Sequence, residues 1–288
     1  MAGDSHHRPG VGFVTIAQRR SPRLRGGRRL GLAVGAVLAL PNPAGAGAPE
    51  CREAPARAER LAGLGVRGEL ILASGQRAVL DGVRWPDRPD LASEAGAWLL
   101  ARNGRSLTLV ARGESDRWGR SHVDATVAET DAEAATPDLA AGLVALGLVA
   151  VDAGERDTLC RPALLAVEAG ARRRGRGLWG QAGPDVRDGP ALRARLGHFV
   201  VMQGAVRWVG ERPRRTYLDF AGRGEDGLTV TVSKRTWRVL QERGLSAASL
   251  RGREVRVRGV VEAWRGPTLD IASADMIEVL DGEQAQRR

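Results

Sequence analysis

The sequence predicts a mixed α+β protein that is mostly β and consists of two small barrels in succession. In residues 66–180, apolar strands alternate with segments of helical periodicity. In residues 196–282, apolar side chains recur at every second position, as in strands with one buried face. Residues 181–195, which begin rich in Gly, Pro and Asp, are expected to link the two. Residues 47–65 precede the first domain, and residues 283–288 form a tail.

The second domain is expected to contain five strands and one helix. The strands are His198–Val209, Arg214–Ala221, Gly227–Val232, Glu254–Ala263 and Thr268–Ile271. Turns with Gly or Pro separate the first three, and an amphipathic helix, Lys234–Arg243, follows the third. Five strands with a helix after the third are the plan of an oligonucleotide/oligosaccharide-binding (OB) barrel. We therefore predict a five-stranded OB-like barrel.

Aromatic and basic residues are interleaved along these strands. OB barrels bind single-stranded nucleic acid by stacking bases on aromatic rings and by placing cations along the phosphates. The candidate binding residues are Arg207, Arg214, Arg215, Arg256, Arg258, Trp208 and Trp264, with Tyr217, Phe220, Trp237 and Arg265 nearby. Because side chains alternate along a strand, Arg256 and Arg258 are expected on one outward face. The alternative is that the aromatic residues fill the core and the arginines only face water.

Residues Val66–Trp179 carry several motifs in a fixed order. Gly75–Asp87 contains an apolar strand, a turn and Val-Leu-x-Gly-Val-x-x-Pro-Asp. A predicted strand, Ser106–Arg112, then leads to Asp116–Arg120, and Gly177–Trp179 follows an arginine-rich helix. This order resembles the staphylococcal nuclease (thermonuclease) family. The resemblance implies an OB barrel with about three helices, expected at Asp90–Asn103, Thr136–Leu148 and Leu159–Arg174.

The resemblance also implies a calcium-dependent site for phosphodiester hydrolysis. This chemistry needs cations on the phosphoryl oxygens, a carboxylate that acts on water and a divalent metal. Arg120 keeps the family's arginine, and Asp87 replaces its glutamate base with a shorter carboxylate. Glu69 matches a further acidic position after a one-residue deletion. If the protein is an active nuclease, these three residues are its catalytic candidates, and Arg120 also contacts the phosphate.

Three other positions depart from the family pattern. Val79 replaces an arginine, Arg84 replaces a metal-binding aspartate, and Trp85 follows it. A cation beside a metal ion costs about 4 kcal/mol at a separation of about 4 Å and an effective dielectric near 20. Loss of one charge-stabilising group lowers the rate by roughly a hundredfold to a thousandfold. We therefore expect no metal site and no cofactor, with calcium only if the nuclease site is active.

The charge of the chain gives a weak nucleic-acid signal. The 288 residues include 44 basic and 34 acidic side chains, a net charge of +10. Residues 1–46 supply seven arginines and one aspartate, whereas residues 49–195 carry 21 basic and 21 acidic side chains. Residues 196–288 carry 16 basic and 12 acidic side chains. Any electrostatic binding of nucleic acid is therefore expected from the second domain.

The first 46 residues have the pattern of an export signal. Several arginines precede the apolar run Leu30–Leu40, and Ala44-Gly45-Ala46 then provides small residues for cleavage. An apolar run of this length is too short to span a bilayer. We expect a periplasmic or secreted protein without a stable transmembrane span in its mature chain. The alternative is that the segment remains uncleaved as an anchor.

The chain contains only two cysteines, Cys51 and Cys160. In an oxidising compartment, a single pair with no other thiol is expected to form a disulfide. The alternative is a buried thiol at Cys160 and a free one at Cys51.

The basic run Arg172–Arg176 has two possible interpretations. It can end a helix, where cations complement the helix dipole, or it can form a patch that binds nucleic acid.

Together these patterns predict an exported binding protein with lost or weak nuclease activity. Its expected ligand is single-stranded nucleic acid or another anionic molecule. One alternative is an active metal-dependent nuclease. Another is an envelope module that binds a protein or a glycan.

Overall fold

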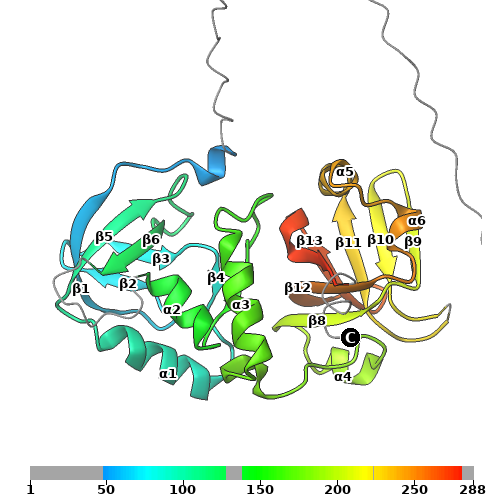
Figure 1. Cartoon of the computed structure of the whole chain (residues 1–288), viewed down its shortest axis with the longest axis horizontal. Helices are drawn as coiled ribbons and strands as arrows, with labels where there is room; N and C mark the ends of the chain where they lie inside the picture. Colours follow the sequence, from blue (N-terminus) through cyan, green and yellow to red (C-terminus); the bar gives the residue numbers. More distant parts are fainter. Residues whose placement is uncertain (1–47, 128–137, 223, 281–288) are drawn as a thin grey trace, which may run out of the picture. The chain divides into compact units, whose positions relative to one another are not determined.

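The structure is a computed structural model that describes residues 48–127, 138–222 and 224–280. All of these residues belong to one compact unit of the chain. The expected signal segment (1–46) and tail (283–288) lie outside the described residues, as does the start of the helix expected from Thr136. The fold is mixed α+β and mostly β, as the sequence predicts, with a closed barrel in the first half and an OB-like half-barrel sheet in the second (Figure 1).

The first half is built on a closed five-stranded barrel. Its strands are β1 (Arg57–Leu64), β2 (Leu70–Leu72), β3 (Arg77–Leu80), β5 (Ser106–Ala111) and β6 (Ser121–Val127). They follow one another around the barrel in the order β1-β2-β3-β6-β5. The pair β3–β6 is parallel and the other pairs are antiparallel. The alternation of Leu107 and Leu109 in β5 with outward residues buries both leucines in the barrel.

Three helices and a small sheet accompany this barrel. The helices are α1 (Pro89–Leu100), α2 (Leu139–Ala145) and α3 (Ala163–Arg173); β4 (Val83–Arg84) pairs with β7 (Ala150–Val151). Helix α1 buries Leu91, Ala95 and Leu99, which lie on one face because they are four residues apart. Helix α3 begins after Pro162 and not at Leu159 as expected. Its last turn contains Arg172 and Arg173, in agreement with the helix-end reading of the basic run.

The second half contains seven strands in one sheet. They are β8 (Phe199–Ala205), β9 (Trp208–Glu211), β10 (Arg215–Asp219), β11 (Thr229–Ser233), β12 (Glu254–Ala263), β13 (Pro267–Ile271) and β14 (Ile277–Val279). The sheet runs β14-β12-β13-β11-β10-β9, and β8 also pairs with β12. Helix α5 (Lys234–Glu242) follows β11, as predicted. Helix α6 (Ala247–Leu250), the short helix Ala274–Met276 and β14 were not predicted.

The prediction of one continuous strand over His198–Val209 is wrong. The chain changes partners between β8 and β9: the Val206 N–H donates to the Arg253 carbonyl at 3.0 Å, and the Arg207 N–H donates to the Asp219 carbonyl at 2.8 Å. Strand β8 therefore pairs with β12, and β9 pairs with β10. If β8 and β9 count as one interrupted strand, the strand order of this half-barrel is that of the first barrel.

The segment expected as a linker packs against the second half. It contains a short helix, α4 (Gly189–Arg193), and its residues Val186 and Leu192 are buried. The Leu228 N–H donates to the Val186 carbonyl at 2.7 Å. Two isolated apolar side chains among glycines and prolines make no periodic pattern, so this packing could not be predicted from the sequence.

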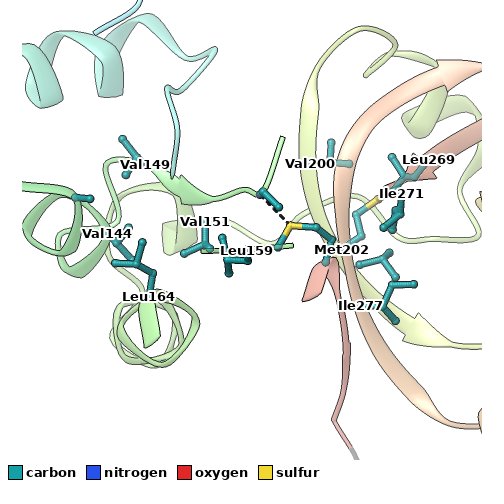
Figure 2. Close-up of a cluster of buried hydrophobic side chains, with 14 of the residues drawn as sticks. Val144, Val149, Val151, Leu159, Leu164, Val200, Met202, Leu269, Ile271 and Ile277 are labelled. Atoms are coloured by element: carbon teal, nitrogen blue, oxygen red, sulfur yellow. Dashed lines mark hydrogen bonds between the residues drawn. The ribbon is translucent and has the colours of Figure 1, made fainter. Parts of the chain in front are cut away.

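Side chains from both halves meet in one buried cluster (Figure 2). Val144, Val151 and Leu159 come from the first half, whereas Met202 and Ile277 come from the second. A buried ion pair lies at the same junction: Nη1 of Arg258 in β12 is 2.8 Å from Oε1 of Glu168 in α3. Neither side chain is more than 1 % exposed. Apolar contacts and a buried ion pair thus join the halves.

The predicted disulfide is confirmed. Cys51 and Cys160 are bonded, with their Cα atoms 5.2 Å apart and a separation of 109 positions in sequence. The bond joins the short helix Pro49–Cys51, ahead of β1, to the turn before α3. None of the helices in the described part of the chain is long and apolar enough to cross a membrane.

Candidate functional site

A groove of about 940 Å³ opens at one end of the first barrel. Its walls include the β1–β2 loop, the segment around β4 and the turn Asp116–Arg120 between β5 and β6. Of the three catalytic candidates, Arg120 and Asp87 line the groove. Glu69 is buried directly before β2.

The turn Asp116–Arg120 is organised by the carboxylate of Asp116. Oδ1 of Asp116 accepts from the backbone N–H of Trp118 at 2.9 Å and from that of Arg120 at 3.0 Å. Gly119, with φ of 72°, adopts the left-handed conformation that the tight turn requires. The Arg120 guanidinium then donates to Asp116 Oδ2 at 2.7 Å and to Glu69 Oε1 at 3.1 Å. Arg120 is therefore held between two carboxylates of the protein.

Glu69 is also bound by other groups. Its Oε1 is 3.1 Å from the Arg77 guanidinium, and its Oε2 accepts from the Arg67 backbone N–H at 3.0 Å. Burial by itself raises the pKa of Glu69, but hydrogen bonds from Arg67 and Arg120 outweigh burial and lower the pKa below its usual value. A side chain at Gly65 would lie 2.4 Å from Glu69 Oε2, so the glycine makes room for the carboxylate. This carboxylate is charged and engaged by cations.

Asp87 has different partners from Glu69 and Arg120. Its Oδ2 accepts from the Phe199 backbone N–H at 3.2 Å and lies 3.4 Å from His198 Nδ1. The structure therefore brings Glu69 and Arg120 into contact and directs the Asp87 carboxylate to the start of β8. Among the described residues, no group of three or more His, Cys, Asp or Glu side chains could hold a metal ion.

Arg84 and Trp85, which stand at positions that the resemblance assigns to metal binding, have structural partners. The Arg84 guanidinium is 3.8 Å from Asp152 Oδ2 and lies over the Phe199 ring. The Trp85 ring packs on Gly68, where an added Cβ would be 2.1 Å from the ring. A cation and an indole thus stand where the resemblance places metal-binding residues.

A buried carboxylate in this groove was not singled out from the sequence. Asp81 is 1 % exposed, and its Oδ1 is 2.5 Å from Arg156 Nη1 and 3.7 Å from His122 Nδ1. Burial lowers the pKa of His122, and the nearby charge of Arg156 lowers it further. In the hairpin motif of Gly75–Asp87, Asp81 stands at a position where the motif allows any residue. Arg156 lies far from it in sequence, so no sequence motif could predict that the two side chains form an ion pair.

The outer face of the second half carries a row of three aromatic rings, of which the two tryptophans are exposed and the tyrosine is half-buried. The Tyr217 and Trp264 rings stack with centroids 5.9 Å apart and planes inclined by 17°. The Trp208 ring lies over Gly210, the residue directly opposite Tyr217 in the β9–β10 pair. Trp208 and Trp264 are 41 % and 46 % exposed. Three rings from β9, β10 and the β12–β13 turn therefore form one face, which we call the aromatic face.

Arginines surround the aromatic face. The Arg212 guanidinium lies 5.9 Å from the Trp208 ring centroid, and that of Arg265 lies 5.2 Å from the Trp264 centroid. Arg207 and Arg214 are exposed and, within the described residues, form no ion pair. Arg215 pairs with Asp270 and donates to Thr231 Oγ1, so its charge is partly neutralised.

The prediction that Arg256 and Arg258 face outward to solvent is wrong. Arg256 is 7 % exposed and interacts with Glu278 and Gln203. Arg258 is 1 % exposed and binds Glu168, Glu278 and the Val151 carbonyl. Strand alternation does put both arginines on one face of β12, but the first half of the protein covers that face. Phe220 and Trp237, by contrast, fill the core as the alternative reading predicts.

No protein-family model matches the chain, and no curated protein matches it either. The similarity to staphylococcal nuclease therefore rests on the sequence motifs. The OB-like topology is compatible with it, but a shared fold does not establish a shared function. The geometry of the groove and of the aromatic face is therefore the basis for a functional assignment.

Proposed function

We propose that this protein binds single-stranded nucleic acid on the aromatic face of its second half and has lost metal-dependent hydrolysis. The observation that carries this proposal is the row of Trp208, Tyr217 and Trp264 rings on the outer side of the strands. Every base has a π-face, so a row of exposed rings binds bases by stacking without reading their sequence.

The cations around these rings support a polyanionic ligand. Two exposed arginines without ion pairs in the described part of the chain, Arg212 and Arg265, lie beside the rings. Arg207 and Arg214 are also exposed and precede β9 and β10 directly in sequence. The positions of Arg212 in the β9–β10 turn and of Arg265 in the β12–β13 turn suit contacts with phosphates on either side of stacked bases. Asp270 and Asp219 also lie on this sheet, but Arg215 and Thr229 engage them.

The groove of the first barrel supports the loss of hydrolysis. We place this half among staphylococcal-nuclease-like domains by its motifs, and its Arg120 is bound by Asp116 and Glu69. A phosphate would have to displace these carboxylates to reach the guanidinium. Arg84 also puts a positive charge where a metal ion would bind, which opposes the metal.

The disulfide supports the proposed export. Disulfides persist in the periplasm and outside the cell, whereas cytosolic proteins are kept reduced. Cys51–Cys160 thus agrees with a periplasmic or secreted protein whose first 46 residues are an export signal.

The test of binding is fluorescence anisotropy with a labelled oligothymidylate and the purified protein at low and moderate salt. Affinity should fall as salt rises, because binding releases counterions from the phosphates. Trp264→Ala should weaken binding roughly tenfold to a hundredfold, the range for one stacked base. Trp118→Ala is the matched control, because Trp118 is an exposed tryptophan of the first barrel.

Several outcomes would contradict the proposal. If the oligothymidylate does not bind at low salt, the nucleic-acid proposal is wrong and a protein or glycan partner is indicated. A loss caused by Trp118→Ala and not by Trp264→Ala would move the site to the first barrel. Cleavage of the oligonucleotide that needs calcium and disappears in Arg120→Ala would establish an active nuclease.

A further inference from the structure

A second cavity, of about 790 Å³, is separate from the groove of the first barrel and from the aromatic face. Its walls come from the end of α3 and the segment after it, from residues 180–187, and from β8. Two close approaches shape it: Gly183 lies against the Val201 carbonyl of β8, and Val186 packs where a side chain at Gly204 would be. Its volume is in the range of small-molecule sites, about 300–1,000 Å³.

Arginines dominate the charged lining of this cavity. Arg172, Arg187 and Arg195 line it, and none of them forms an ion pair among the described residues. A fourth arginine, Arg88, also lines it but pairs with Asp90. The lining carboxylates are Asp185 and Glu254, and Asp185 accepts from the backbone N–H of Arg187. The cavity therefore carries an excess of positive charge.

Two neighbouring donors on the cavity wall have no acceptor. The Arg172 guanidinium stacks 4.4 Å from the centroid of the Trp179 ring. Arg172 Nη1 and Trp179 Nε1 are both buried, and neither has a hydrogen-bond partner in the part of the chain described here. Buried donors are normally paired, because leaving one unpaired is destabilising. Both unpaired groups are N–H donors, so a ligand that pairs with them must offer a hydrogen-bond acceptor.

The electrostatic environment of Arg172 would favour an anion beside its guanidinium. Burial lowers the pKa of Arg172 to about 10, and the nearby charge of Arg256 contributes in the same direction. Glu168 and Glu278 act in the opposite direction but form their ion pairs with Arg258. A bound anion would favour the charged guanidinium.

We infer that this cavity binds a small molecule through a phosphate group held by Arg172, Arg195 and Trp179 Nε1. A guanidinium offers paired N–H donors that match the oxygens of a phosphate. The cavity is larger than one phosphate, and the indole of Trp179 offers an aromatic surface for the remainder of the ligand. The predicted ligand class is therefore a phosphate monoester with a planar group, such as a nucleoside monophosphate.

The test is calorimetric titration of the purified protein with inorganic phosphate, adenosine 5′-monophosphate and adenosine at constant ionic strength. The monophosphate should bind most tightly, phosphate more weakly, and adenosine weakest of the three. Arg172→Gln should weaken monophosphate binding by about tenfold or more, because it removes a charged donor. Arg173→Gln is the matched control: Arg173 is the exposed neighbour of Arg172 and does not line the cavity.

Arg195→Gln keeps the inference testable if the Arg172 variant fails to fold, because Arg195 is exposed. It should weaken binding in the same direction. Binding of neither phosphate nor monophosphate by the native protein would overturn the inference. An equal loss of monophosphate affinity in Arg172→Gln and Arg173→Gln would also overturn it, since affinity would then depend on the net charge of the protein and not on the cavity. Retention of monophosphate binding in Trp264→Ala is expected, because the aromatic face is a separate site.

Discussion

The two halves of this protein have the same strand order but differ at the surfaces where OB barrels bind ligands. In each half, a parallel pair joins the third strand to the last strand of the barrel, β3–β6 and β11–β13. In each half, an exposed tryptophan lies at the turn before that last strand: Trp118 in the first and Trp264 in the second. The common fold therefore does not explain their differences.

The difference lies in what the charged side chains contact. In the first half, Arg120 and Arg77 bind Glu69, so these cations stabilise the protein's own loop, although Arg117 lies over the exposed Trp118 ring without an ion pair among the described residues. In the second half, Arg212 and Arg265 flank exposed rings and are not in ion pairs within the described residues. Charges that are paired inside the protein stabilise a fold, whereas unpaired ones beside exposed rings are available to a ligand. This contrast is the basis of the following predictions.

The largest expected effect is on the junction of the two halves. Glu168→Gln should lower the free energy of unfolding by about 3–5 kcal/mol, because it removes the fully buried one of the two carboxylates that neutralise Arg258 and leaves only the partly exposed Glu278. Chemical denaturation measures this change. Asp157→Asn is the control, since Asp157 pairs with the largely exposed Arg235 and should cost less than about 1 kcal/mol. An equally small loss in Glu168→Gln would mean that the ion pair does not join the halves.

The disulfide should stabilise the first half without affecting the proposed ligand face. Replacement of both Cys51 and Cys160 by serine should lower the free energy of unfolding by about 2–5 kcal/mol, because the bond closes a long loop in the unfolded chain. Oligonucleotide affinity of the folded variant should stay within about twofold of the native value. A large loss of affinity would show that the two halves do not function separately.

A smaller effect is expected in acid. The pKa values of Glu69 and Asp116 are lowered in the folded protein, so the unfolded chain binds more protons than the folded one when the pH falls below their usual values. Their contribution to stability is present above about pH 4.5 and is lost as the pH falls through the folded-state values. Chemical denaturation between pH 6 and pH 3 should show that the free energy of unfolding falls less steeply in Glu69→Gln than in the native protein. If the free energy of unfolding falls equally steeply with pH in the variant and in the native protein, Glu69 contributes nothing to the acid sensitivity.

Local patterns in the sequence were sufficient for most of the secondary structure. Strand β12 begins and ends at the predicted residues, Glu254 and Ala263, because alternation over ten positions is a strong signal. The disulfide could be predicted because the chain has only two cysteines. The interrupted strand over β8 and β9 was missed, because apolar residues continue through the break while the hydrogen-bond partners change.

The sequence by itself determined which residues share a strand face and where cations and aromatic rings gather along the chain. Only the tertiary structure decided which of these groups reach solvent. Arg256 and Arg258 alternate as outward residues should, yet the first half covers them; Arg207 and Arg214 remain exposed. The physical reason is that periodicity depends on neighbours in sequence, whereas burial and ion pairing depend on elements packed from distant parts of the chain.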